Sequence, residues 1–437
     1  MAQPPARLWR QRDFLLLWSG QSISQLGSQV TVWALPLTAV LLLHASPMET
    51  GLLTAASIAP YVLAGLIAGA WVDRVRRRPL MIAADVGRAV LLLSIPLAAW
   101  SGTLTLAQLY GVAGATGLCA IVFDVAYGAF LPAIVPRDQL LDANGKLEAS
   151  NAVAGIAGPG LAGVLVQLLS GPSALLADAF SFVASFGSLS VIRTHETLRP
   201  HAGDQRPSWL HEIRQGVRLV ATHDMLRPLA VSAALFTFFD TMLIAIYVPY
   251  LVRELHIPAA LLGGIFAVAG GGGLLGAGLA APVANRAGIG RAMVGGILLA
   301  ALAETVIALA QGPVLLAAAL VTLGEAGVQG GDVVSSVANR SARQTVVPDA
   351  TQGRVTATMR VLVAALGALG AVLGGWSADR LGLRLTVLIA GVGTIVAALW
   401  LWSTPVRHLR GLATPSSQSH VGSQGGCPAV PPPPDVS

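Results

Sequence analysis

Twelve long apolar stretches constrain this chain more than any other feature of its sequence. The stretches are roughly 18 to 25 residues long, the length that crosses the hydrocarbon core of a bilayer as a helix. Lipid cannot satisfy backbone hydrogen bonds, so such stretches must satisfy their own by forming helices. The predicted spans are residues 14–43, 50–72, 80–100, 105–130, 147–169, 173–192, 228–251, 259–284, 292–311, 313–336, 356–378 and 385–403.

The low charge of the chain supports the same interpretation. Only 11% of its 437 residues are charged, whereas ordinary globular proteins have about 25%. A soluble protein of this length could not cover its surface with so few polar groups. We therefore predict an all-α polytopic membrane protein that lies in a lipid bilayer.

The basic residues indicate the orientation of the chain in the membrane. If the N-terminus is cytoplasmic, nearly all of the 27 basic residues fall in cytoplasmic segments. Arg253, Arg380 and Arg384 fall on the outer side, and Arg88 lies just inside the third span. Lys146 is the single lysine, a bias typical of a GC-rich bacterial genome. We predict a multi-pass protein of the bacterial inner membrane with both termini cytoplasmic, whose basic charge reflects its loops rather than nucleic-acid binding.

An internal repeat at an offset of 212 residues divides the chain in two. The offset maps Val135-Pro136 onto Val347-Pro348, Gly51 onto Gly263, and Asp73-Arg74 onto Asn285-Arg286. Chance alignment of small residues in a chain with 49 glycines is the alternative explanation. The offset corresponds to six spans, an even number, so it predicts two parallel six-helix repeats. Three further glycines follow the same offset, Gly155, Gly158 and Gly163 onto Gly367, Gly370 and Gly375.

The repeat and the polar segments define four predicted regions. Residues 1–193 form the N-terminal six-helix bundle, and residues 228–405 form the C-terminal one. The cytoplasmic linker, residues 194–227, contains apolar residues at helical spacing opposite charged ones, which predicts an amphipathic helix. Residues 406–437 are predicted to be a disordered cytoplasmic tail, because their later part is rich in Ser, Gly and Pro.

The loop after the second span carries a recognisable motif. It includes Gly69, Asp73, Arg74, Arg77 and Arg78, and it resembles the Gly-x-x-x-Asp-Arg-x-Gly-Arg-Arg signature of the major facilitator superfamily. An arginine at position 76 replaces the second glycine. We expect the loop to form a cytoplasmic gate with Asp85 and Arg88 of the third span. The alternative is that its arginines determine topology only.

Other segments resemble one bacterial branch of this superfamily, which includes the enterobactin exporter and macrolide-efflux-like proteins. They are residues 12–18, 131–159 and 347–355. The resemblance implies twelve helices, alternating access and export driven by proton exchange. Gly155, Gly158, Pro159 and Gly163 are similar to the Gly-Pro motif in span five of drug and proton antiporters, although plain helix packing explains them equally well.

Ionisable residues inside the spans are candidate machinery, because each costs roughly 3 kcal/mol at the centre of a membrane helix. Asp178 falls near the outer end of its span, where it could reach water. Asp332 is also embedded but is not among the coupling candidates. By depth, the candidates for proton coupling are Asp240 and Glu325 first, followed by Glu304 and Asp124.

Amides and aromatic rings are candidates for the substrate cavity. Gln21, Gln25 and Gln29 repeat every four residues, so they share a helix face that should avoid lipid. We expect them to face a cavity or a neighbouring helix. Packing is the alternative role for most of the aromatic candidates, which are Phe123, Tyr127 and Phe130 on the fourth span and Phe236, Phe239, Tyr247 and Tyr250 on the seventh.

The function predicted from these features is secondary transport. We expect a monomer that exports a hydrophobic or amphipathic compound, such as a drug, macrolide or siderophore-like molecule, in exchange for protons. The sequence contains no phosphate-binding Gly-Lys-Ser/Thr loop and no evident catalytic or metal-ligand set, so we expect neither an enzyme nor a cofactor. An importer of the same fold, or a membrane receptor or scaffold without transport, remains open.

Overall fold

The computed structural model describes residues 8–64, 75–193, 209–346 and 349–409, and these residues are helical almost throughout. A short 3₁₀ turn (Leu8–Arg10) precedes the first helix, and another (Arg137–Gln139) precedes α6. The helices of the first half are α1 (Arg12–Leu41), α2 (Pro47–Ala64), α4 (Arg77–Trp100), α5 (Leu106–Ile134), α6 (Leu140–Leu169) and α7 (Gly171–Val191).

The second half repeats this pattern after the linker helix α8 (Trp209–Thr222). Its first helix continues beyond Pro249 as a π-helical turn (Tyr250–Glu254), where the proline ring removes one backbone donor. The helices are α9 (Leu226–Pro249), α10 (Ala259–Ala287), α11 (Ile289–Ala308), α12 (Val314–Val346), α13 (Asp349–Leu381) and α14 (Leu383–Ser403).

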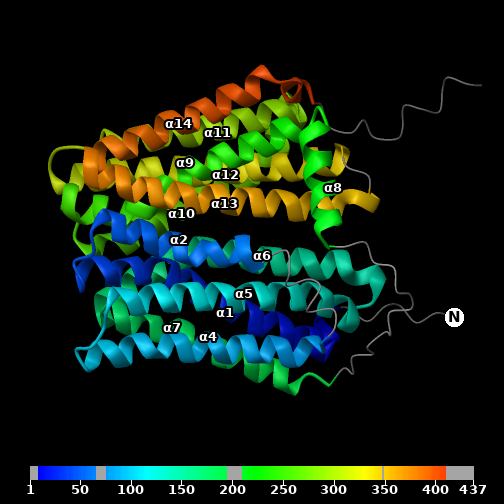
Figure 1. Cartoon of the computed structure of the whole chain (residues 1–437), viewed down its shortest axis with the longest axis horizontal. Helices are drawn as coiled ribbons and strands as arrows, with labels where there is room; N and C mark the ends of the chain where they lie inside the picture. The colour runs from blue at the N-terminus through cyan, green and yellow to red at the C-terminus, as the bar shows by residue number, and fades with distance from the viewer. Residues whose placement is uncertain (1–7, 65–74, 194–208, 347–348, 410–437) are drawn as a thin grey trace, which may run out of the picture.

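Ten helices in the described part of the chain are long and apolar enough to cross a membrane. The remaining two of the twelve, α1 with 30 residues and α2 with 18, also have the length of a membrane span. All twelve lie side by side in one bundle (Figure 1). The prediction of an all-α polytopic membrane protein with two six-helix repeats is confirmed.

The helices group into two halves that meet along a shared interface. In Figure 1, α1 to α7 fill the lower half of the view, α9 to α14 fill the upper half, and α8 crosses one end. Helix α8 packs against α9 and α13. We call this the α8 end and the opposite one the far end. The largest contacts between the halves are those of α2 with α13 and of α6 with α10.

Two glycine pairs from the internal repeat lie at this interface. A Cβ atom on Gly263 would lie 2.9 Å from the Cα atom of Gly163, and one on Gly375 would lie 3.2 Å from the Cα atom of Gly51. The 212-residue offset maps one pair onto the other, because it relates Gly51 to Gly263 and Gly163 to Gly375. Glycine allows this backbone approach because it has no side chain. The repeated glycines thus form two equivalent contacts between the halves.

The residues of the predicted Gly-Pro motif in α6 have different packing partners. Gly163 packs against α10, and Gly158 packs against the side chain of Gln29 on α1. Pro159 is buried inside the bundle. A Cβ atom on Gly155 would meet nothing within 4 Å. Close helix packing therefore explains Gly158 and Gly163, but it does not explain Gly155.

The C-terminal region differs from the prediction at its beginning. The tail was expected to be disordered from residue 406, but a 3₁₀ turn (Pro405–His408) packs against α11 and buries Val406. The backbone N–H of Gly290 donates a hydrogen bond to the carbonyl of Leu409. The chain is therefore ordered through residue 409, because Val406 and these backbone groups have partners on α11. The rest of the predicted tail, residues 410–437, lies outside the described residues.

Candidate functional site

A cavity of about 370 Å³, which we call the central cavity, lies between the two halves. Helices α1, α2 and α5 line it from the first half, and α9 and α12 line it from the second. Its volume is typical of pockets that hold small molecules, about 300 to 1,000 Å³. The lining residues are Thr31, Val32, Trp33, Leu35, Pro36, Leu53, Thr54, Ser57, Ala113, Thr116, Asp240, Leu243, Ile244, Tyr247, Val248, Glu325, Val328, Gln329 and Asp332.

Three carboxylates from α9 and α12 lie in the wall of this cavity. Asp240 and Glu325 are two of the predicted coupling residues, and the structure brings them to the same cavity. Asp332 is the third and lies two turns of α12 beyond Glu325. The hydroxyl of Tyr247 donates a hydrogen bond of 2.9 Å to Oε2 of Glu325, which fixes the orientation of that carboxylate.

Four embedded carboxylates of the second half form an electrostatic group. Asp240 interacts electrostatically with Glu304, Asp332 and Glu325. Among the described residues, none of the four forms an ion pair with a basic side chain. Removing a carboxylate from water is costly unless it gains a cation, hydrogen bonds or a proton. This group is therefore suited to bind protons or a positively charged ligand.

Glu304 lies outside the central cavity, between α11 and α14. Its side chain is fully buried, and the hydroxyl of Thr394 donates a hydrogen bond of 2.9 Å to Oε2. Its Oε1 has no hydrogen-bond partner in the described part of the chain. Glu304 can therefore act on the cavity through its electrostatic interactions with Asp240 and Glu325.

A second, smaller cavity of about 250 Å³ adjoins the first on the side of the α8 end. We call it the side cavity. It is lined by α9, α11, α12 and α13, and it contains the basic residues Arg343 and Arg360. Asp332 lines both cavities, so this residue marks their junction.

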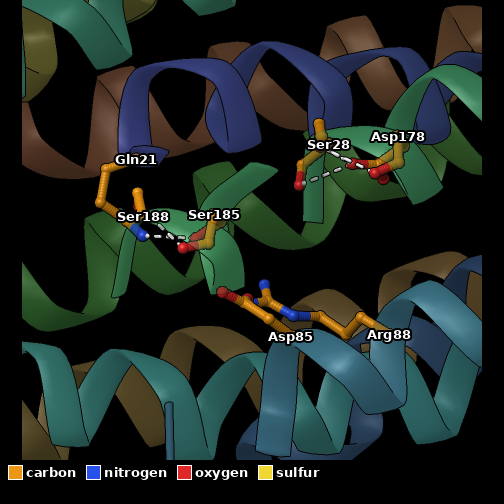
Figure 2. Close-up of polar contacts among 8 residues, drawn as sticks. Gln21, Ser28, Asp85, Arg88, Asp178, Ser185 and Ser188 are labelled. Carbon is orange, nitrogen blue, oxygen red and sulfur yellow. Dashed lines mark hydrogen bonds and ion pairs between the residues drawn. The ribbon is translucent and has the colours of Figure 1, made fainter. Parts of the chain in front are cut away.

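The first half contains a buried ion pair between Asp85 and Arg88 (Figure 2). The guanidinium of Arg88 lies over the rings of Phe123, at 4.7 Å, and Phe182, at 4.2 Å. We expected this pair near the end of its span as part of the gate. Asp85 is instead fully buried, two turns inside α4, because α7 packs over this part of α4.

Asp178 differs more clearly from its prediction. It was expected near water at the outer end of its span, but only 1% of its surface is exposed. Its carboxylate accepts hydrogen bonds from the hydroxyls of Ser28, Thr31 and Ser181. Helix α1 covers this face of α7 and supplies two of these donors, and Figure 2 shows the contact with Ser28. Asp178 therefore joins α1 to α7.

Asp124 is exposed on α5 and lies outside the lining of the central cavity. Its partners are the hydroxyl of Tyr61 on α2 and, through electrostatic interaction, Arg88 and Arg360. Because Arg360 belongs to α13, this interaction reaches across the two halves. Unlike Asp240, Asp124 has cations nearby.

Apart from Tyr247, the predicted substrate-cavity residues do not line the central cavity. Gln21 donates a hydrogen bond to Ser185 on α7, at 3.4 Å, and Gln29 packs on Gly158. Gln25 is half-buried on the same helix. The amides were expected to face a cavity or another helix, and for Gln21 and Gln29 the neighbouring helix is what the structure shows.

The aromatic candidates mainly pack against other side chains. Phe123 stacks against Tyr127, with ring centroids 6.2 Å apart, and Phe239 packs against Gly393 of α14. Phe236 lines the side cavity instead of the central one. Of the other aromatic candidates, Tyr247 lines the central cavity, whereas Phe130 and Tyr250 are buried and lie outside its lining.

The central cavity also contains Trp33, which was not among the predicted residues. Trp33 continues the series of Gln21, Gln25 and Gln29, and each step of four residues turns about 40° around a helix. The first member of the series therefore faces α7, whereas the fourth reaches the cavity. The four-residue repeat, continued by one step, is the sequence signal from which Trp33 could have been predicted.

Part of the predicted gate lies outside the described residues, namely Gly69, Asp73 and Arg74. The two arginines that begin α4 are described. Nη1 of Arg77 donates to the carbonyl of Ala129, at 3.1 Å, and Nε of Arg78 donates to the carbonyl of Leu189, at 2.8 Å. These arginines join the start of α4 to the last turns of α5 and α7, where helix carbonyls favour positive charge.

A membrane-spanning bundle whose two related halves enclose a ligand-sized cavity defines this protein as a polytopic membrane transporter. The family model described as "Major Facilitator Superfamily" matches residues 17–343 and 229–425, and the chain belongs to this superfamily. The predicted family is therefore confirmed, and it is a family of transporters rather than of enzymes.

Similar proteins agree with this classification. The chain is 29% identical over 375 residues to the multidrug efflux pump Tap of Mycolicibacterium fortuitum, covering 82% of this chain and 88% of that protein. It is 30% identical over 390 residues to an uncharacterised MFS-type transporter of Mycobacterium bovis, covering 83% and 85%.

Among solved structures, the nucleoside transporter NupG superposes with a TM-score of 0.75 at 12% identity, covering 89% of this chain and 99% of that one. A bacterial homologue of the iron transporter ferroportin superposes with a TM-score of 0.68 at 16% identity, covering 89% and 98%. At these identities, the two structures support the fold alone.

Proposed function

We propose that this transporter exports a hydrophobic or amphipathic small molecule in exchange for protons, by alternating access to the central cavity. The similarity to a multidrug efflux pump supports the direction of transport and the breadth of the substrate class. Drug-like, macrolide-like and siderophore-like compounds belong to that class. The central cavity supports the binding step, because side chains from both halves line it.

The observation that carries the proposal is the set of three cavity carboxylates, none of which forms an ion pair among the described residues. A carboxylate favours its neutral form in a closed apolar cavity and its charged form when water enters. Asp240 and Glu325 would therefore take up a proton on one side and release it on the other. The hydrogen bond from Tyr247 to Glu325 would orient that carboxylate toward the cavity. Glu304 is the next candidate, and Asp124 follows.

The gates would alternate at the two ends of the bundle. At the α8 end, Asp73 would bind the arginines of its own loop, and Arg77 and Arg78 would hold α4 against α5 and α7. At the far end, the glycine pairs between the halves would allow close contact. Substrate would enter the cavity from one end while the other end is closed.

The same proposal includes the orientation of the protein in the membrane, its division into two bundles and its oligomeric state. The α8 end would face the bacterial cytoplasm together with both termini, as the distribution of basic residues predicts. The two bundles would be residues 1–193 and 228–405, joined by the linker at 194–227. One chain encloses a complete cavity, so a monomer would be sufficient for transport.

The experiment is transport by purified protein in proteoliposomes under an imposed pH gradient. Two amphiphilic dyes serve as probes, neutral Nile red and cationic rhodamine 6G. We expect protons moving down their gradient to drive a dye in the opposite direction. Asp240→Asn and Glu325→Gln are measured separately, and loss of uphill transport with retained dye exchange identifies the coupling residue. Glu254→Gln, in an exposed ion pair with Arg384, is the control.

Three results would contradict the proposal in different ways. Dye that moves in the same direction as the protons would indicate an importer. Absence of counterflow for both dyes in folded protein would favour a receptor or scaffold. Uphill transport that survives in both variants would place coupling elsewhere and make Glu304 and Asp124 the next residues to test.

A further inference from the structure

The wall of the central cavity contains an aromatic cluster that joins both halves. Trp33 of α1 lies against Phe266 of α10, with ring centroids 4.0 Å apart and planes inclined by 33°. Tyr247 of α9 completes the cluster, 6.4 Å from Trp33 and 6.0 Å from Phe266. Trp33 and Tyr247 line the cavity, and Phe266 is buried behind them. The cavity therefore offers a broad apolar surface to a ligand.

Asp240 and Asp332 lie in the wall of the same cavity. Unlike Glu325, which is bound by Tyr247, neither carboxylate accepts a hydrogen bond from a side chain in the described part of the protein. Both lie deep in the bundle and are only partly exposed, and both line the cavity, so the exposed part is available to a ligand. Neither carboxylate forms an ion pair among the described residues.

Basic residues do not neutralise these carboxylates within the cavity. None of the described residues that line the central cavity is basic. Arg343 and Arg360 line the adjoining side cavity together with Asp332, but neither forms an ion pair with Asp332 or Asp240. A negatively charged ligand in the central cavity would lie beside three carboxylates, and an uncharged ligand would leave them unpaired.

We propose that the central cavity selects lipophilic cations, with the positive charge beside Asp240 and Asp332 and the apolar body against Trp33 and Tyr247. This inference rests on the proposed transport function and adds the charge of the substrate to it. The carboxylates attract the cation directly, and the face of an indole or phenol ring adds about 0.5 to 2 kcal/mol. Only the apolar surface contacts the rest of the ligand and constrains its size and shape. The cavity can therefore accept a range of different cations.

The same arrangement links the substrate to proton exchange. A cation that enters the cavity pairs with carboxylates that would otherwise hold protons, so the two compete for the same groups. Binding of the cation favours release of a proton, and binding of a proton favours release of the cation. When a cation and a proton exchange, the buried carboxylates are neutralised both in the cation-bound state and in the proton-bound state.

The first test is direct binding of radiolabelled tetraphenylphosphonium to the purified full-length protein, without a pH gradient. Two dyes with the same aromatic ring system then compete with the label. Rhodamine 6G is a cationic ester, and rhodamine 19 is its free acid, which has no net charge near neutral pH. We expect rhodamine 6G to displace the label at a concentration at least about tenfold lower than rhodamine 19 does.

Variants locate the binding groups. We expect Asp240→Asn and Asp332→Asn each to weaken tetraphenylphosphonium binding about tenfold, whereas Asp240→Glu, which keeps the charge, restores most of it. Trp33→Leu should weaken binding by less, about three- to tenfold. Glu254→Gln at the far end is the control and should bind as the wild type does. Size-exclusion chromatography and thermal unfolding show that each variant is folded.

The outcomes separate this inference from the proposed function. Equal competition by the two rhodamines, or absence of phosphonium binding to folded wild-type protein, would overturn the selection of cations, even if a pH gradient drives the export of neutral Nile red. Selective binding of the cations without any proton-driven transport would instead leave the cation site standing and reject the proposed coupling.

Discussion

Arg88 shows how single residues divide between structural and transport roles in this protein. It pairs with Asp85 and lies between two phenyl rings in the interior of the first half. A buried pair of this kind contributes little net stability, but removal of one partner leaves the other charge uncompensated. Asp240, Glu325 and Asp332 of the second half line the central cavity, and none of them forms an ion pair in the described part of the chain.

We therefore expect Arg88→Leu to destabilise the protein by about 3 to 5 kcal/mol, because Asp85 would remain buried without its cation. Adding Asp85→Asn to this variant should recover part of the loss. The measurement is thermal unfolding of the protein in detergent. The control is Arg384→Gln, whose ion pair with Glu254 at 3.4 Å is partly exposed, so the expected cost is below about 1 kcal/mol. Equal losses in the two variants would contradict the structural role of Arg88.

At the scale of helices, the glycines of the internal repeat define how the halves meet. Gly163 on α6 and Gly263 on α10 bring two backbones together, and Gly375 on α13 and Gly51 on α2 do so at the equivalent position. Both contacts join one helix from each half. Any movement of the halves relative to each other must change these contacts.

We expect Gly163→Ala to reduce the transport rate and to destabilise this arrangement by about 1 to 3 kcal/mol, because the new methyl group would collide with the backbone of Gly263. Gly375→Ala should have a similar effect through Gly51 and the neighbouring Pro47 and Met48. The matched control in the same helix is Gly155→Ala, where a methyl group meets open space. Dye transport in proteoliposomes measures the rate. A normal rate in both interface variants would show that the close contacts do not take part in the transport cycle.

The loop between α2 and α4 is the other element with a predicted role. Asp73→Asn should abolish transport while the protein still inserts and folds, since the change removes one charge from the predicted gate without changing its volume. Transport in proteoliposomes and the yield of folded protein check the two parts of this expectation. If the variant transports at the wild-type rate, the loop contributes to topology only.

At the scale of the whole molecule, the position of α8 relates the two halves to the membrane. The helix lies across the end of the bundle against α9 and α13, as an interfacial helix would (Figure 1). The far end carries the turn after α4, which includes Ser101. These two places lie on opposite sides of the apolar part of the bundle, so they can report its orientation.

We expect a cysteine at Ser101 to react with an impermeant thiol reagent in intact cells, and one at Thr222 to react only after the membrane is opened. Both side chains are exposed in the structure. The background carries Cys119→Ser and Cys427→Ser, so that only the introduced thiol is labelled. Equal labelling of Thr222→Cys in intact cells would reverse the predicted orientation.

The amino-acid sequence by itself determined the class of fold, the number of long helices, the repeat and the family. These depend on hydrophobic length, on a constant offset and on a motif within one loop, all of which can be read along the chain. The sequence also identified Asp240 and Glu325 as candidates for proton coupling, because the depth of a residue in the membrane follows from its position along a span. Only the tertiary structure decided which embedded side chains meet. Each depends on helices that are distant in sequence: α1 covers Asp178, α7 packs over Asp85, and the turn of α1 directs Gln21 to α7 but Trp33 to the cavity.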